Sequence, residues 1–299
     1  MTTKSLVNAA MMTAIYLVLL MLYTIGILPS LMSLLLPIPI IVYSLKSRKF
    51  LEIILVFIAC LIGSFFLTSV LGLFATFLYG ISGIILGWGF VKKWPYWQRI
   101  LNSGITYMIG FPILFSRLAG MTLTESSLIF IGDAFNMAKN VMPESNAQFA
   151  EMQNVMTTFI PQIMPTVILL TGIMISFFTD LIAQIILKRL RIENSNLGKI
   201  KDFQLGRLIA IIYLISQFGL LLIPTPEIQV ILINIVLLLN ILFIFQGIIV
   251  LFSFFKNRNK RVPITILIFL FLFNALITLS LLGVMDAMFD YRNRFKMNE

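Results

Sequence analysis

The sequence has no histidine, one cysteine and few charged residues, and each shortage excludes a class of protein. Without histidine, the chain lacks the commonest general base and the commonest metal ligand. The single Cys60 excludes an intrachain disulfide and any metal site built from cysteines. Charged residues make up 11% of the chain, against roughly 25% in an average globular protein, while hydrophobic residues make up 60%. We therefore expect a membrane protein.

Long stretches without charge divide the chain into membrane spans. Residues 53–91 carry no charge, and as one helix they would be roughly 58 Å long, about twice the hydrocarbon core of a bilayer, so they must fold back once. Residues 5–45 also hold two passes, and Pro37 and Pro39 predict a kink in the second. The expected fold is an all-α polytopic bundle of eight or nine helices. The nine candidates are residues 6–28, 30–45, 51–68, 70–91, 98–119, 159–187, 207–223, 228–255 and 262–285.

The basic residues predict the orientation of these spans. Alternating loops place 17 of the 22 Lys and Arg residues on one side, among them Lys92, Lys93 and Arg99 in one loop. The positive-inside rule then puts the N-terminus in the cytoplasm of a multi-pass cell-membrane protein. The C-terminal tail, which includes Asp286 and Asp290, is close to neutral. The net charge of +10 is explained by the basic loops, which set the topology and attract anionic lipid. Because the sequence has no separate basic domain, nucleic acid is not an expected partner.

Residues 120–158 form the one long external loop. Apolar residues at helical spacing, interrupted by Pro143, predict two short amphipathic helices in this loop. They would act either as an interfacial spacer or as a lid over an outward cavity, since loops of this length in compact bundles are often functional.

A few polar residues fall within or beside the spans. Apart from Glu52 at the edge of the 51–68 span, Asp180 is the only acid within a predicted span, which makes it a candidate for ion or proton coupling, although pairing with a nearby basic loop is the favoured interpretation. Arg117 closes its helix on the outer side, where it would snorkel to headgroups or bind a carboxylate or phosphate. Asn240, Gln246 and Asn274 are intramembrane amides, and an antiparallel hairpin predicts a hydrogen bond between the last two.

No motif for ATP hydrolysis, metalloprotease or serine-hydrolase chemistry is present in the sequence. An enzyme would have to work without histidine, on Asp180 alone, so we expect no catalytic residues, no cofactor and no metal. Any ATP-driven uptake would need partner subunits.

The start of the chain carries a resemblance to known membrane proteins. A basic N-terminus, the Ala10-Met-Met-Thr-Ala14 face, a short proline-containing second helix and a glycine-rich fourth helix resemble the substrate-binding (S) components of energy-coupling-factor transporters. More closely, the segments Ser5-Leu-Val-Asn-Ala-Ala-Met-Met-Thr-Ala-Ile-Tyr and Leu36-Pro-Ile-Pro-Ile-Ile-Val-Tyr-Ser-Leu are similar to the YybS-like family. This is an uncharacterised family of Gram-positive membrane proteins, distantly similar to S components.

The resemblance to S components covers residues 1–190, a six-helix region with the outer loop 120–158; residues 191–299 add three helices and a short tail. It implies that Ala10 and Ala14 meet a transmembrane coupling subunit that works with ATPases. It also implies substrate capture by the 98–119 helix, the outer loop and the start of the 159–187 helix, with Arg117 and Asp133 as candidate binding residues. The expected function is capture or transport of a small vitamin-like molecule. The alternative is a membrane scaffold or assembly protein of the cell envelope, without a small-molecule substrate.

Overall fold

The computed structural model describes residues 3–68, 70–141, 146–192, 203–255 and 275–290, and within these ranges the regular structure is helical throughout. The helices divide into two compact units, Met1–Gly198 (unit 1) and Lys199–Glu299 (unit 2). Six helical segments in the described part are long and apolar enough to cross a membrane. The structure therefore confirms the all-α polytopic fold. The number of crossings stays a prediction, because the last predicted span, 262–285, begins outside the described residues.

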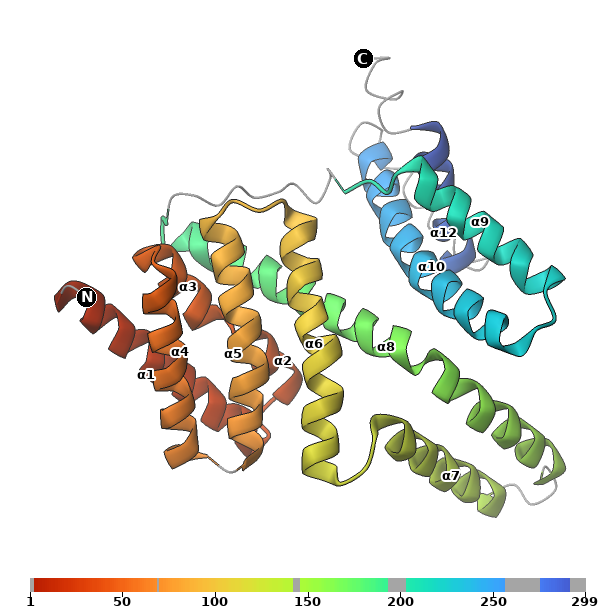
Figure 1. Ribbon diagram of the computed structural model, residues 1–299, viewed down its shortest axis with the longest axis horizontal. Helices are drawn as coiled ribbons and strands as arrows, with labels where there is room; N and C mark the ends of the chain where they lie inside the picture. The colour runs from red at the N-terminus through yellow and green to blue at the C-terminus, as the bar shows by residue number, and fades with distance from the viewer. Residues whose placement is uncertain (1–2, 69, 142–145, 193–202, 256–274, 291–299) are drawn as a thin grey trace. The chain divides into compact units, whose positions relative to one another are not determined.

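The described residues of unit 1 form the helices α1 to α8 (Figure 1). They are α1 (Thr3–Ile25), α2 (Pro29–Leu35), α3 (Ile38–Ser47), α4 (Phe50–Leu67), α5 (Val70–Val91), α6 (Tyr96–Ala119), α7 (Leu123–Val141) and α8 (Asn146–Arg189). The second predicted span is broken at Pro37 into α2 and α3, because a proline ring cannot continue the preceding helical turn. The core of the unit lies between α1, α3, α4, α5 and α8, where Tyr16, Ile40 and Leu86 are fully buried.

The turns that carry basic residues lie at one end of unit 1. The α3–α4 and α5–α6 turns carry Lys46, Lys49, Lys92 and Lys93, and α8 ends there on Lys188 and Arg189. The start of α1 lies at the same end, because the Ser5 hydroxyl donates to Glu52 Oε2 over 2.8 Å. We call this the basic end of unit 1, and the opposite end the far end.

The glycines of α5 bring this helix close to α3. A Cβ atom on Gly83 would lie 2.9 Å from the carbonyl oxygen of Pro37, and one on Gly87 would meet Ser44. Small side chains let two helix backbones approach in this way, so these glycines pack within the unit.

Residues 120–158, predicted to be an external loop, differ in structure from that expectation. They contain α7 and the first part of α8. The whole of α8 is a single helix of 44 residues, roughly 66 Å long. The expected second amphipathic helix and the 159–187 span are therefore one continuous helix. Pro161 and Pro165 lie inside this helix and do not end it. α7 runs back along the first part of α8 (Figure 1), with Lys139 Nζ donating to Gln153 Oε1 over 2.9 Å.

Unit 2 contains α9 (Arg207–Leu222), α10 (Pro226–Phe255) and α12 (Ala275–Phe289). Its core is formed by buried side chains from all three helices, including Tyr213, Phe243 and Val284. α10 and α12 cross at two glycines, because a Cβ atom on Gly247 would overlap the backbone of Leu279 and one on Gly283 would overlap the backbone of Phe243.

Candidate functional site

A buried ion pair joins α6 to α8 near the basic end of unit 1. Arg99 Nε donates to Asp180 Oδ1 over 3.0 Å and Arg99 Nη2 donates to Asp180 Oδ2 over 3.2 Å. The side chains are 1% and 0% exposed. Such a two-pronged contact uses the planar fork of the guanidinium and fixes both the distance and the orientation of the two helices.

The remaining polar atoms of the pair are also satisfied. Arg99 Nη1 donates to the carbonyl oxygen of Trp94 over 3.1 Å, and Gln184 Nε2 donates to Asp180 Oδ2. The Arg99 guanidinium carbon lies 4.1 Å from the centre of the Phe90 ring, which adds a cation–π contact. A buried charge pair persists only when its lone pairs and protons are occupied in this way.

The position of Arg99 corrects the sequence analysis, which placed this residue in a basic loop. The structure places it in the first turn of α6 and inside the unit. The signal for this was the uncompensated charge of Asp180, since an acid within an apolar helix requires a cation nearby. Asp180 lies on α8 and is paired with Arg99, a basic residue, which is the kind of pairing that the sequence analysis favoured over ion or proton coupling.

A second polar layer lies one helical turn farther from the basic end. Ser103 follows Arg99 by one turn of α6, and Ser176 precedes Asp180 by one turn of α8. The Ser176 hydroxyl donates to Ser103 Oγ over 2.9 Å, and Ser82 Oγ on α5 lies 2.8 Å from Ser103 Oγ. Three helices are thus joined through buried hydroxyls.

The two proposed ligand-binding residues lie apart from this core. Arg117 in the last turn of α6 and Asp133 on α7 are both exposed, and among the described residues no ion pair or hydrogen bond joins them. Their assignment as binding residues stays a prediction.

Two adjoining hollows lie between α6, α7 and α8. The larger has a volume of about 570 Å³, the smaller about 310 Å³, and both contact Met164. The larger is lined by Phe115, Leu123, Ser126, Ser127, Phe130, Ile131, Ile160, Ile163, Met164 and Val167. We call the pair the α6–α8 hollow. Neither Arg117 nor Asp133 lines it, and apart from the hydroxyl-bearing Thr124, Ser126 and Ser127 its lining is apolar.

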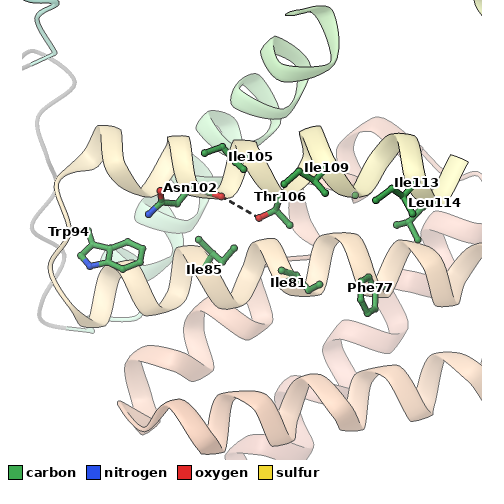
Figure 2. A pocket seen from close by; sticks show the side chains of 11 residues that line it. Phe77, Ile81, Ile85, Trp94, Asn102, Ile105, Thr106, Ile109, Ile113 and Leu114 are labelled. Carbon is green, nitrogen blue, oxygen red and sulfur yellow. Dashed lines mark hydrogen bonds between the residues drawn. The ribbon is translucent and has the colours of Figure 1, made fainter. Parts of the chain in front are cut away.

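A groove of about 580 Å³ runs between α5 and α6 (Figure 2). Its side chains lie along both helices, with Trp94 at one end and Phe77 towards the other. Its main polar groups are Asn102 and Thr106, and the Thr106 hydroxyl donates within its own helix to the Asn102 carbonyl oxygen over 3.2 Å. Ile109 is 58% exposed, as expected of a helix surface that faces lipid.

The polar residues of unit 2 form their own buried cluster. Gln246 Oε1 accepts from the backbone N–H of Leu205 over 2.9 Å, and Gln246 Nε2 donates to Asp286 Oδ2 over 2.8 Å. Asn274, the expected partner of Gln246, lies outside the described residues. Asp286 was counted with the C-terminal tail, but it lies within α12 and is fully buried, where the amide of Gln246 provides a polar partner inside the helix pair.

Two further sequence predictions concern Asn240 and the first helix. Asn240 Oδ1 accepts a hydrogen bond of 3.2 Å from the Tyr213 hydroxyl. Ala10 and Ala14 lie on an exposed face of α1. In the described part of the chain, no group of three or more Cys, Asp or Glu residues could hold a metal ion.

Comparison with known proteins supports the family resemblance. The chain is 23% identical over 317 aligned positions to the uncharacterized protein YybS of Bacillus subtilis (strain 168), covering 98% of this chain and 99% of that protein. No solved structure was found to match. The likeness to S components therefore stays a prediction. Residues 13–287 match the model of the family described as predicted membrane protein (DUF2232), and the chain belongs to this family of multi-pass membrane proteins.

Proposed function

We propose that this protein captures a small, largely apolar molecule of vitamin-like size in the α6–α8 hollow and acts in its uptake. The observation that carries the proposal is the hollow itself, whose two parts have volumes of about 570 and 310 Å³. Ligand sites are concave, mostly apolar and typically about 300–1,000 Å³ in volume. The role is one of binding, without catalysis.

The construction of the hollow supports this proposal. α6 and α7 meet at a bend of 66°, which leaves space between them that the first part of α8 covers from one side. The bend is fixed by Gly120, whose φ of 67° ends α6, and by a capping box in which Glu125 accepts from the backbone N–H of Thr122 over 2.7 Å. The space is therefore set by helix ends rather than by loosely packed side chains.

The energy for uptake would come from partner proteins. The Ala10 and Ala14 face of α1 is exposed together with Val7 and Val18, which are 57% and 58% exposed. Small residues on an exposed transmembrane face suit close contact with another helix. We propose that this face contacts a transmembrane coupling subunit, which would in turn work with ATPases.

Filling the hollow should abolish ligand capture. Ile163→Trp places an indole in the larger part of the hollow, whereas Val155→Trp adds the same group at a position on α8 that is 63% exposed and does not line it. Mass spectrometry of small molecules retained by the purified proteins should find the ligand with wild type and Val155→Trp, and lose it with Ile163→Trp.

Two outcomes would count against capture. Equal retention by all three proteins would place the ligand elsewhere, and a preparation that contains protein partners but no small molecule would favour the scaffold alternative. In the scaffold alternative, a partner protein would bind the exposed apolar surface of α7, where Phe130 is 75% exposed and Met137 is 70% exposed.

We propose that the basic end of unit 1 lies in the cytoplasm, as the positive-inside rule requires. Because Cys60 is the only cysteine, Cys60→Ala gives a background in which Lys93→Cys and Asp133→Cys can be compared. An impermeant maleimide applied to intact cells should label Asp133→Cys, and should label Lys93→Cys only after lysis. The reverse pattern would contradict the proposed orientation.

A further inference from the structure

Four hydroxyl groups in the interior of unit 1 lack a hydrogen bond of normal geometry. They belong to Tyr16, Tyr96, Tyr107 and Thr179, and these are the buried side-chain atoms without a partner in the described part of the chain. Leaving a buried hydroxyl unpaired destabilises a folded protein, because the group loses its hydrogen bonds to water. Ordered water is the usual partner of such groups in protein interiors, so their clustering in one unit requires an explanation.

Two of these hydroxyls belong to residues beside Arg99 or Asp180 along the chain or in space, and the other two lie farther from the basic end. Thr179 adjoins Asp180 in the sequence, and Tyr96 is close enough to Asp180 and Arg99 to interact with their charges. Tyr107 is two turns, or roughly 12 Å, beyond Arg99 on α6. Its hydroxyl lies near Ser82, the residue that already contacts Ser103.

Two more tyrosines, Tyr79 and Tyr23, continue from Tyr107 towards the far end of the unit, and their rings are in contact. The Tyr79 and Tyr107 ring centres are 5.8 Å apart, and so are those of Tyr23 and Tyr79. The Tyr16 hydroxyl lies beside these tyrosines, near Thr76 on α5. We call the set Ser176, Ser103, Ser82, Tyr107, Tyr79 and Tyr23 the hydroxyl file.

The directions of the helices give the order in which the residues of the file lie between the basic end and the far end. α1 and α6 run from the basic end outward, whereas α5 and α8 run towards it. Ser103 and Tyr107 therefore lie progressively farther from the basic end, and Tyr23 lies near the far end of α1. The file runs through the interior of unit 1 from the far end to one helical turn short of the Arg99–Asp180 pair.

We propose that the hydroxyl file, completed by bound water, is a proton pathway that ends at Asp180. A hydronium ion at the far end gives its proton to the first oxygen, and each oxygen passes its own proton to the next. One O–H bond forms for every one that breaks, and nothing is oxidised or reduced. The Asp180 carboxylate, faced by Arg99, Tyr96 and Gln184, accepts the proton and releases it to water beyond Trp94 at the basic end.

This pathway gives the polar core a role that structural packing alone does not require. Ionisable residues inside a membrane are costly and often mark ion or proton routes, and Asp180, at the end of the proposed pathway, is such a residue. The inference is independent of the proposed capture, because no residue of the file lines the α6–α8 hollow.

The test is proton flux through the full-length protein in liposomes. Vesicles of neutral lipid would hold a trapped pH-sensitive dye, and valinomycin with potassium would clamp the membrane potential. An imposed pH difference should decay faster with wild type than in protein-free vesicles. Tyr107→Phe removes one oxygen from the file and keeps the ring, so it should slow the decay by about tenfold or more. Ser103→Ala should have a similar effect, because it removes both serine contacts.

Tyr43→Phe is the matched control, because Tyr43 is also buried but its hydroxyl contacts Ser5 and Glu52, outside the file. It should conduct as wild type does, and circular dichroism should show equal helicity in all variants. Equal decay with wild type and Tyr107→Phe would overturn the proposal, as would a wild-type rate no greater than that of protein-free vesicles. Ligand retention by Tyr107→Phe, measured in parallel, separates a failure of the pathway from a failure of capture.

Discussion

Asp180→Ala is expected to destabilise unit 1 by about 3–5 kcal/mol, because it leaves the guanidinium of Arg99 buried without its counter-charge. Arg99 is 1% exposed and cannot reach water without moving α6. The carbonyl of Trp94 would remain its one hydrogen-bonding partner among those in the structure. Unfolding of the detergent-solubilised protein, followed by circular dichroism, measures the loss.

A double substitution separates the cost of an unpaired charge from the value of the pair. Arg99→Met with Asp180→Leu removes both charges and retains side-chain volume, so its stability should lie within about 1–2 kcal/mol of wild type. Lys49→Ala removes an exposed lysine from its ion pair with Glu52, whose carboxylate keeps its hydrogen bonds from Ser5 and Ser47, so it should have a much smaller effect than Asp180→Ala. A double variant as unstable as Asp180→Ala would show that packing, and not the unpaired charge, sets the loss.

Gly247→Leu is expected to separate α10 from α12 and to destabilise unit 2 by about 3 kcal/mol or more, at the upper end of overpacking effects. Even a single Cβ atom at this position would overlap the carbonyl of Leu279, and backbone cannot turn aside as a side chain can. The separation would also break the Gln246–Asp286 hydrogen bond, which joins the same two helices. Limited proteolysis of unit 2, together with its unfolding transition, measures the effect.

Gly219→Ala is the control for this prediction. A Cβ atom there would meet the end of the Leu232 side chain at 3.0 Å, and this side chain can adopt another rotamer. Alanine also favours a helix over glycine by about 1 kcal/mol, so Gly219→Ala should be neutral or mildly stabilising. Normal stability of Gly247→Leu would contradict the close crossing of α10 and α12.

The fold class could be predicted from the sequence because a bilayer imposes a length and a polarity on every span. The uncharged residues 53–91 are too long for one crossing, and the structure divides them between most of α4 and all of α5. Pro37 and Pro39 indicated a break in the second span, and α2 and α3 meet there. Such signals are local, so one sequence is sufficient to detect them.

The arrangement of the site could not be predicted, because it depends on contacts between distant segments. Arg99 and Asp180 are 81 positions apart, and charge counting assigned one to a loop and the other to a span. The continuity of α8 was missed because the polar residues before 159 were read as part of a loop, although they form the first turns of the same helix. The α6–α8 hollow depends on the bend at Gly120, whose angle no local pattern specifies.

The central claim is that the α6–α8 hollow is a ligand site, and an experimental structure of the protein in lipid nanodiscs tests it most directly. The account predicts compact, non-protein density in contact with Met164, Ile163 and Phe130, and its loss in Ile163→Trp. A structure in which α6, α7 and α8 pack against one another and leave no space at Met164 would contradict the account.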